Sequence, residues 1–394
     1  MRPAFVTRYT AVSCLGAGLA ATRAALIEEC SGLAPCRFDT IELATYVGEA
    51  AGVDEARLPA ELARFDCRNN RLALLALRRD GLDEAVRASV ARHGAERVGV
   101  FIGTSTSGIL QTELAYRRRG ADGSLPADFN YATTHNSFSA VEFARQYLGL
   151  AGPAAAVSCA CASSAKVFAQ AARLFEAGLI DAALVGGVDS LCLTTLYGFH
   201  SLQLTSAQPC RPFDAARDGL SIGEAAAFVL LEREPPGAGG LALLGAGESS
   251  DAYHMSSPHP QGLGAQLAMR TALEAAGLDA RHIDYINLHG TGTLGNDKAE
   301  SMAVNALFAG ATPCSSTKAA TGHTLGAAGA LEAVICLLAI EQQLLPAGLN
   351  VRQVEPALQL DYVRRHRRQP LRRVLSNSFG FGGANCSLIF GRAP

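Results

Sequence analysis

The sequence has no marked excess of charge of either sign. Its 34 lysine and arginine residues nearly balance its 36 aspartate and glutamate residues, so the formal net charge is −2. A protein that binds a polyanion over its whole surface needs a large positive charge. The basic run at residues 364–368 has no Phe, Tyr or Trp between its arginines, so we interpret it as ordinary surface. We therefore expect no nucleic-acid partner.

Several patterns that would indicate other classes of protein are also missing. No basic start is followed by a long apolar stretch, and no apolar run reaches the length of a membrane span, so we expect neither a signal peptide nor a membrane association. The 11 cysteines follow no spaced framework, which indicates reduced thiols and a cytoplasmic location. No strand–GxGxxG–helix unit is present, which argues against a dinucleotide-binding enzyme.

What the sequence does contain is a regular alternation of strand and helix patterns on both sides of a Gly/Pro-rich linker at residues 234–240. We expect strands at 97–103, 154–157, 181–187, 225–232, 241–244, 285–288, 374–378 and 386–390, and helices at 109–117, 137–148, 165–177, 263–276, 298–308 and 325–342. This order predicts an α/β fold with parallel sheets covered by helices. We expect two similar halves, 1–236 and 237–394, that arose by duplication.

Cys161 lies between a predicted strand and a predicted helix. Ser163 or Ser164 is positioned to cap that helix, which places Cys161 in the turn at its N-terminus. Unpaired backbone N–H groups and the helix dipole favour an anion there. We therefore expect the pKa of this thiol to lie below that of a free cysteine, as a nucleophile requires. The alternative interpretation is a small buried core residue.

Three segments of the second half carry further polar groups. His289 follows a predicted strand and opens a His-Gly-Thr-Gly-Thr loop, a position where α/β sheets place ligands, although a buried structural histidine also fits. Lys318 and His323 surround a helix start and either share one pocket or belong to a surface loop. The glycines of residues 377–385 indicate a close backbone approach, N–H groups directed at a ligand, or a plain turn.

Taken together and in this order, the four segments resemble the signatures of β-ketoacyl-acyl-carrier-protein synthases. Residues 249–255 resemble the elongating types I and II, and residues 197–202 resemble synthases of aryl polyene clusters. The resemblance implies a thiolase-like fold with duplicated βαβαβ halves, each with a mixed sheet, in α-β-α-β-α layers. It also implies acyl carrier protein as a partner, with substrates on its phosphopantetheine and no other cofactor. The expected assembly is a homodimer, or a heterodimer with a chain-length-factor-like subunit.

The resemblance also implies a decarboxylative Claisen condensation in fatty acid, polyketide or aryl polyene elongation. Cys161 takes an acyl group from a carrier thioester, and the backbone N–H groups of Cys161 and Phe381 hold the oxyanion. Malonyl carrier protein then loses carbon dioxide, and His289 and His323 donate hydrogen bonds to the enolate oxygen. The resulting carbanion attacks the acyl group on Cys161. Phe381 is also the expected gate between Cys161 and the malonyl group.

Further roles follow from the same resemblance. Lys318 is expected to act as a cation near the site and to form an ion pair with the supporting residue Glu300. The other implied site residues are Thr291 and Thr293 for the pantetheine arm, Thr106 for the acyl pocket, and Arg64 and Arg68 for docking of the acidic carrier protein.

Three other functions compete with this interpretation. A chain-length factor lacks the nucleophile, whereas this chain has Cys161, although an active synthase subunit can still need such a partner. A Cys–His acyl hydrolase needs one histidine and an orienting group, and does not account for two histidine motifs. Cys159 and Cys161 form a C-x-C pair that suggests zinc, but alternate residues of a strand point to opposite faces, so we expect no metal site.

Overall fold

The main strands of the protein fall into two sets, one in each half of the chain. The computed structural model describes residues 1–234 and 240–393. The predicted boundary between residues 236 and 237, with most of the linker, lies outside the described residues and stays a prediction. The main strands of the first half are β1 (Ala4–Ser13), β5 (Val98–Gly103), β6 (Ala154–Val157), β7 (Ala182–Asp189) and β9 (Ala225–Glu232). Those of the second half are β10 (Leu241–Ser250), β11 (Tyr285–Asn287), β12 (Cys314–Ser315), β15 (Arg373–Phe379) and β16 (Ala384–Arg392).

The two halves repeat one strand order. In the first, β5 pairs in parallel with β6 and β7, and β7–β9 and β9–β1 are antiparallel. In the second, β11 pairs in parallel with β12 and β15, and β15–β16 and β16–β10 are antiparallel. The prediction of parallel sheets from the strand–helix alternation is therefore right for the pairings of β5 and β11 and wrong for β9 and β16, which run antiparallel to both of their neighbours within their half. The mixed sheets implied by the resemblance are confirmed.

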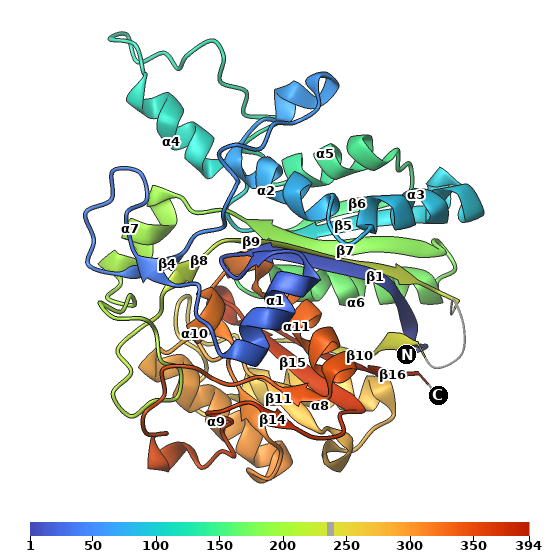
Figure 1. The fold of residues 1–394 in the computed structure, drawn as a ribbon, viewed down its shortest axis with the longest axis vertical. Coiled ribbons are helices and arrows are strands. Elements are labelled where there is room, and N and C mark those ends of the chain that lie inside the picture. Colours follow the sequence, from blue (N-terminus) through green and yellow to red (C-terminus); the bar gives the residue numbers. More distant parts are fainter. Residues whose placement is uncertain (235–239, 394) are drawn as a thin grey trace.

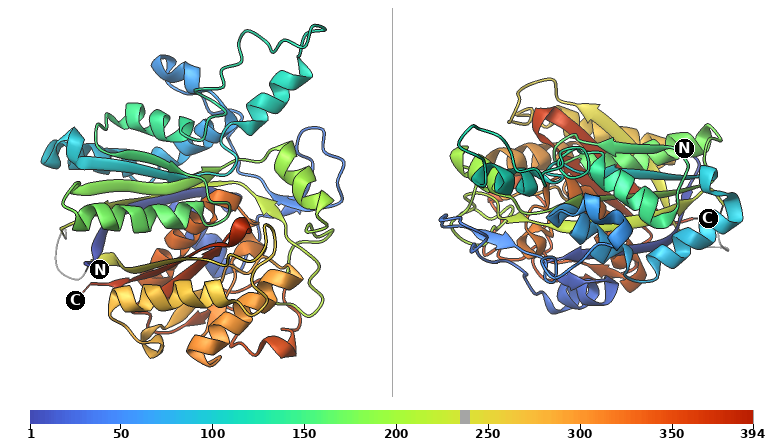
Figure 2. Two further views of the ribbon diagram at one scale, coloured as in Figure 1. Left: turned by 180° about the vertical axis from the view of Figure 1, so that it is seen from behind. Right: turned by 90° about the horizontal axis from the view of Figure 1, so that it is seen from above.

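Helices form three layers around these strands. The outer face of the first half is covered by α2 (Arg68–Leu77), α3 (Leu82–His93) and α5 (Ser139–Leu148). The middle layer is α6 (Ser163–Glu176) and α11 (Ala328–Gln342), which contact each other and strands of both halves. The outer face of the second half is covered by α8 (Leu263–Ala276) and α9 (Leu294–Phe308). Figures 1 and 2 show the resulting helix–sheet–helix–sheet–helix stack, which confirms the expected layers.

The two halves meet edge to edge as well as through the middle layer. β1 pairs with β10 at Ala4↔Leu243 and Phe5↔Ala242, which joins all the main strands into one continuous sheet path. The equivalent strands β6 and β12, at the opposite ends of that path, lead into the helices of the middle layer. The segments that follow β6 and β12 thus converge near the centre of the molecule.

The helical stretch Leu325–Gln342 is long enough and, with a mean hydropathy of 1.6, apolar enough to cross a membrane. The expectation that no apolar run reaches this length is therefore wrong. In the structure 89% of it is buried inside the protein. The core position of α11 between the two halves accounts for this burial, because a helix with neighbours on all sides is apolar all round.

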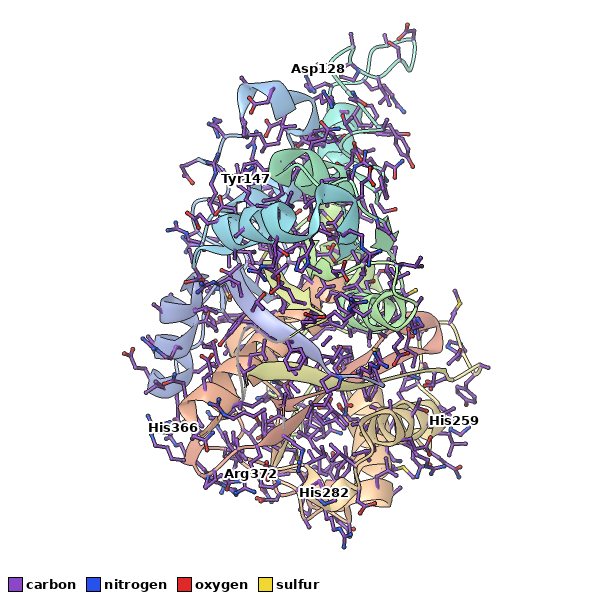
Figure 3. All side chains as sticks on the ribbon, turned by 90° about the vertical axis from the view of Figure 1, so that its right-hand side faces the viewer. Asp128, Tyr147, His259, His282, His366 and Arg372 are labelled. Carbon is purple, nitrogen blue, oxygen red and sulfur yellow. The ribbon has the colours of Figure 1, made fainter. Side chains whose placement is uncertain are left out.

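The remaining elements are short or peripheral. They are α1 (Leu19–Glu28), α4 (Ile109–Arg117), α7 (Leu193–Ser201), α10 (Lys318–Thr321), β2 (Gly16–Ala17), β3 (Ala34–Pro35), β4 (Tyr46–Gly48), β8 (Ile222–Gly223), β13 (Leu344–Leu345) and β14 (Arg367–Arg368). α4 and the loop after it project from the body as an arm, with Asp128 near its tip (Figure 3). His366 lies on the surface at the other end of the molecule, in the basic run interpreted as surface (Figure 3).

Candidate active site

Cys161 occupies a strained turn between β6 and α6. The residue before it, Ala160, has φ of 48°, a left-handed conformation that non-glycine residues rarely adopt. The predicted serine cap is wrong. Ser163 is the first residue of α6, and its Oγ accepts the Cys159 N–H and donates to the Ala160 carbonyl. Ser164 Oγ instead accepts the N–H of Ala330 in α11. Both serines therefore hold the turn and the middle layer together.

The glycine-rich segment after β15 lies directly against this turn. A Cβ atom on Gly380 would lie 3.0 Å from the Cys159 carbonyl oxygen and 3.1 Å from the Cys161 nitrogen. These distances are shorter than ordinary van der Waals contacts, so a side chain here would require the backbone around Cys161 to shift. The close backbone approach predicted from the glycines is thus confirmed, and it brings the Phe381 N–H within reach of the Cys161 thiol.

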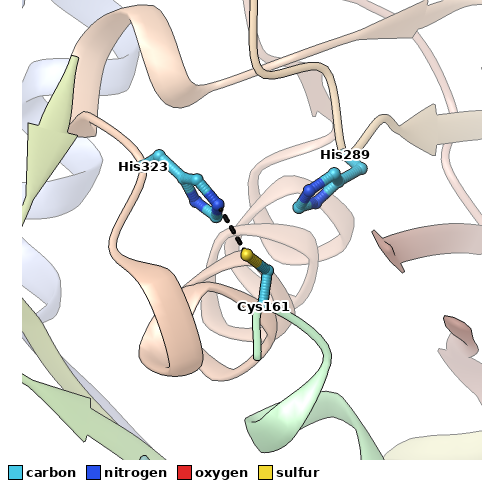
Figure 4. Close-up of side chains that lie close together, drawn as sticks. All are labelled: Cys161, His289 and His323. Carbon is cyan, nitrogen blue, oxygen red and sulfur yellow. Dashed lines mark hydrogen bonds between the residues drawn. The ribbon is translucent and has the colours of Figure 1, made fainter. Parts of the chain in front are cut away.

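Both histidines of the second half converge on Cys161, as Figure 4 shows. His323 follows α10, and its Nε2 lies 2.9 Å from Cys161 Sγ. His289 follows β11, and its ring centroid is 5.2 Å from that of His323, in an edge-to-face arrangement. All three side chains are buried. Residues far apart in the sequence therefore form one cluster at the junction of the two halves.

Lys318 is the buried cation behind this cluster. Its Nζ donates a 2.5 Å hydrogen bond to the His289 carbonyl and lies 3.4 Å from His289 Nδ1. An ammonium group has only donors, so Nδ1 accepts and the proton of the neutral His289 ring lies on Nε2. Lys318 therefore selects the tautomer in which His289 can donate a hydrogen bond from Nε2.

The predicted ion pair between Lys318 and Glu300 is wrong. Lys318 pairs with Glu332, a residue of α11. Glu300 instead accepts the backbone N–H groups of His289 and Gly290, at 2.7 and 2.8 Å, and supports the histidine loop. Sequence reasoning missed Glu332, although it is the one acidic residue in the apolar stretch 325–340, and a carboxylate there signals a buried partner.

Burial dominates the electrostatics of the cluster. Loss of water and the nearby Lys318 cation hold the pKa values of both histidines well below their usual value, so both rings are neutral at pH 7. Burial also raises the pKa of the Glu332 and Glu300 carboxyl groups to about 7. For the Cys161 thiol, burial raises the pKa to about 12, against the opposing effects of Lys318 and the Phe381 N–H. The expected low pKa of this thiol is therefore wrong.

We predict that alkylation of Cys161 by iodoacetamide accelerates about tenfold per pH unit between pH 7 and pH 9. The thiolate is the reacting form, and below a pKa of about 12 its fraction grows tenfold with each pH unit. The measurement is peptide-level mass spectrometry of Cys161 over a pH series. A rate that is already constant from pH 7 upwards would instead show a low pKa.

The cluster opens into a cavity of 490 Å³. Thr291 and Thr293 line it, as do Phe381 and Phe199, whose ring centroids are 5.5 Å apart. Thr106 does not line this cavity. It is buried, and its hydroxyl donates to Asp189, so the place of Thr106 in an acyl pocket stays a prediction.

Arg68 is not available for docking, which corrects that prediction. Its side chain is 5% exposed and forms ion pairs with Glu49, Asp54 and the fully buried Glu224. Arg64, in contrast, is exposed and donates a 2.6 Å hydrogen bond to Gln146. Helical position explains the difference: Arg68 is the first residue of α2, which covers the sheet, whereas Arg64 precedes that helix.

We predict that Arg68→Ala lowers the free energy of unfolding by about 3 kcal/mol. Removing one partner of a buried ion pair leaves an uncompensated charge, here that of Glu224. Two backbone N–H groups that still donate to Glu224 keep the loss at the lower end of the usual range. Urea denaturation measures the change. The control is Arg64→Ala, which should stay within about 0.5 kcal/mol of the original protein; equal effects of both changes would contradict the prediction.

The cluster also has the residue types of a metal site. The ligand atoms of Cys161, His289 and His323 lie within 4.8 Å of one another. A metal bound to His289 Nε2 would force the ring proton onto Nδ1, which faces the Lys318 ammonium. The donor set therefore fits a resident cation poorly, and the absence of a metal stays a prediction.

Comparison with known proteins identifies the family. Residues 68–236 match the β-ketoacyl synthase N-terminal domain and residues 242–352 match the β-ketoacyl synthase C-terminal domain. The chain is 34% identical over 373 residues to 3-oxoacyl-[acyl-carrier-protein] synthase 2 of Mycobacterium tuberculosis, covering 86% of this chain and 88% of that protein. It is 35% identical over 306 residues to nodulation protein E of Rhizobium meliloti, covering 75% and 76%.

Solved structures agree with this assignment. A ketosynthase from Xenorhabdus doucetiae, solved in complex with its chain length factor, superposes with a TM-score of 0.91 at 38% identity, covering 100% of this chain and 98% of that chain. A β-ketoacyl synthase from Burkholderia phymatum superposes with a TM-score of 0.88 at 31% identity, covering both chains fully. The chain belongs to the β-ketoacyl synthase family of the thiolase superfamily.

Proposed function

We propose that this protein is a 3-oxoacyl-[acyl-carrier-protein] synthase that elongates an acyl chain by decarboxylative Claisen condensation. One observation carries the proposal. A buried thiol, two neutral imidazoles and the Phe381 backbone N–H converge at the inner end of a single cavity. An acyl hydrolase would need only one of these imidazoles.

In the first half-reaction, the Cys161 sulfur attacks the thioester carbonyl of an acyl carrier. Because its pKa is raised, the thiol needs a base as it attacks, and the neutral His323 is 2.9 Å away. The backbone N–H groups of Cys161 and Phe381 hold the oxyanion. The departing pantetheine sulfur takes a proton, and the acyl group stays on Cys161 as a thioester.

In the second half-reaction, a malonyl carrier enters the same cavity, where Thr291 and Thr293 bind its pantetheine arm. Loss of carbon dioxide leaves an enolate. His289 donates a hydrogen bond to its oxygen, as does His323 in the tautomer that carries its proton on Nε2. The enolate carbon then attacks the acyl thioester. Cys161 leaves as a thiolate, and the product is a 3-oxoacyl carrier two carbons longer. Lys318 keeps the His289 proton on Nε2, where this step needs it.

The assembly and pathway are part of the proposal. The structure of the Xenorhabdus doucetiae ketosynthase contains a chain length factor. This similarity favours a heterodimer with a chain-length-factor-like subunit over a homodimer. The resemblance of residues 197–202 is the support for an aryl polyene pathway over housekeeping fatty acid synthesis. The cysteines of the described residues are all free, which fits reduced thiols and a cytoplasmic location.

Intact-protein mass spectrometry tests the proposal. The protein is incubated with acyl carrier protein and then with malonyl carrier protein, and the carrier products are analysed. The expected result is a stable acyl adduct on Cys161, followed by an extended 3-oxoacyl carrier that forms only with malonyl carrier. Release of free acid without malonyl carrier would identify a hydrolase. If extension needs an added chain-length-factor-like subunit, the heterodimer is supported.

We predict that Arg64→Glu raises the Michaelis constant for carrier-bound substrates and leaves that for a small soluble thioester unchanged. An exposed cation attracts an acidic carrier, and this attraction is screened over about 8–10 Å, so the effect shrinks at high salt. Steady-state kinetics at two salt concentrations measure it. Arg281→Glu is the control, because Arg281 is 80% exposed and neighbours His282, at the end of the molecule opposite Asp128 (Figure 3). Equal losses with both substrates would exclude docking.

A further inference from the structure

We propose that Ser105 and Asp189 are positioning residues that orient the Cys161 N–H as an oxyanion donor. The inference rests on the proposed function, since it concerns the acyl-transfer steps of that reaction. Neither residue lines the active-site cavity. Both act through the peptide group that precedes Cys161.

Asp189 ends β7 and is fully buried, and no Lys or Arg of the described residues forms an ion pair with it. Its carboxylate instead accepts hydrogen bonds from consecutive residues of the loop after β5. It accepts the Thr104 hydroxyl at 2.7 Å, the Ser105 N–H at 2.8 Å, and the Thr106 N–H and hydroxyl at 2.8 Å each. A buried charge held by donors from one loop fixes the position of that loop.

The loop after β5 is also bonded to the turn that contains Cys161. Ser105 Oγ donates a 3.1 Å hydrogen bond to the Ala160 carbonyl oxygen. That carbonyl belongs to the same peptide group as the Cys161 N–H. In a trans peptide the two point in opposite directions, and the described residues contain no cis peptide. Fixing the carbonyl on Ser105 therefore fixes the direction of the Cys161 N–H.

This peptide needs such a restraint. The left-handed conformation of Ala160, with φ of 48°, is one that an alanine adopts only when its surroundings impose it. Ser163 Oγ also donates to the Ala160 carbonyl, from the side of α6. Ser105 contributes the second hydroxyl, from the loop after β5, so the carbonyl oxygen is held from two directions.

The same carboxylate reaches the second half of the protein. Asp189 Oδ2 accepts the N–H of Gly326, three residues after His323, at 2.5 Å. A Cβ atom on Gly326 would lie 2.6 Å from Asp189 Oδ2 and 2.7 Å from the Ser105 nitrogen, so this contact requires glycine. Asp189 therefore ties the Cys161 turn of one half to the His323 segment of the other.

The contact of Ser105 with the Ala160 carbonyl and the contact of Asp189 with the Gly326 N–H predict different effects on acylation and on decarboxylation. The tetrahedral intermediates of acyl transfer use the Cys161 N–H, whereas the decarboxylation enolate is held by the two histidines. Ser105→Ala should slow acylation of Cys161 about tenfold, because a misdirected donor loses part of its contribution. Decarboxylation of malonyl carrier should stay within about twofold. Asp189→Asn should slow both steps, because its carboxylate also holds the segment of His323.

The experiment measures both steps separately: rapid-quench mass spectrometry for acylation, and acetyl-carrier formation for decarboxylation. Ser107→Ala is the matched control, since its hydroxyl is in the same loop but donates to the Thr134 and Asn136 carbonyls, and both steps should stay unchanged. Ser105→Thr keeps the hydroxyl and should restore acylation.

Equal slowing of both steps by Ser105→Ala, or no slowing of either, would overturn the inference. Failure of Ser105→Thr to restore acylation would also overturn it. The original protein serves as the reference for the proposed function. If it forms no extended product, the proposed function fails, whereas the inference fails only when the original protein is active and the variants lack the selectivity.

Discussion

Cys161→Ala should abolish acyl transfer and condensation while decarboxylation of malonyl carrier stays measurable. The methyl side chain cannot form a thioester, so no acyl group is held for the carbanion to attack. The enolate oxygen, in contrast, is bound by His289 and His323, and His289 is anchored independently of the thiol. Lys318 still holds His289, because its ammonium group donates to the ring Nδ1 and to the backbone carbonyl of His289. Acetyl carrier should therefore accumulate from malonyl carrier in this variant.

The neighbouring cysteine provides the control for this prediction. Cys159→Ala removes a thiol from the same turn and should leave acylation and condensation close to the original rates. Intact mass after incubation with acyl carrier reports acylation, and product analysis reports condensation. Full condensation activity in Cys161→Ala would place the nucleophile elsewhere, with Cys159 as the first residue to test.

The second large effect concerns the two histidines. His289→Ala and His323→Ala should each slow malonyl decarboxylation by about 10²–10³-fold, the usual cost of losing one donor to a developing oxyanion. The structure separates their effects on acylation. His323 Nε2 lies 2.9 Å from the Cys161 sulfur, whereas His289 is held by Lys318. We therefore expect His323→Ala to slow acylation as well, and His289→Ala to leave it nearly unchanged.

Glutamine variants distinguish donation from base catalysis. A glutamine amide donates a hydrogen bond but does not take up a proton, so His289→Gln should retain more decarboxylation than His289→Ala. His323→Gln should regain decarboxylation but not acylation. Rates of the two half-reactions, measured separately with carrier substrates, decide the question. If both alanine variants decarboxylate normally but cannot be acylated, the histidines serve only to activate the thiol, and the donor role proposed here is wrong.

Much of the fold was predictable because its signals are local. Apolar runs and glycine or proline boundaries located the main strands and helices to within a few residues, and the regular alternation indicated two similar halves. Strand direction was not predictable in this way. An antiparallel pairing such as β1–β9 joins segments more than 200 residues apart, and no local pattern specifies the partner.

The sequence by itself determined which chemical groups the protein has, because motifs such as those of Cys161 and His289 are short and contiguous. Only the tertiary structure decided what surrounds them. Lys318 pairs with Glu332 rather than Glu300, and Arg68 is enclosed by three carboxylates rather than free to dock a partner. The pKa of the Cys161 thiol is raised because burial outweighs the effect of nearby donors. Ion pairs, exposure and desolvation all depend on which distant segments pack together, and that information is set by the whole fold rather than by any one motif.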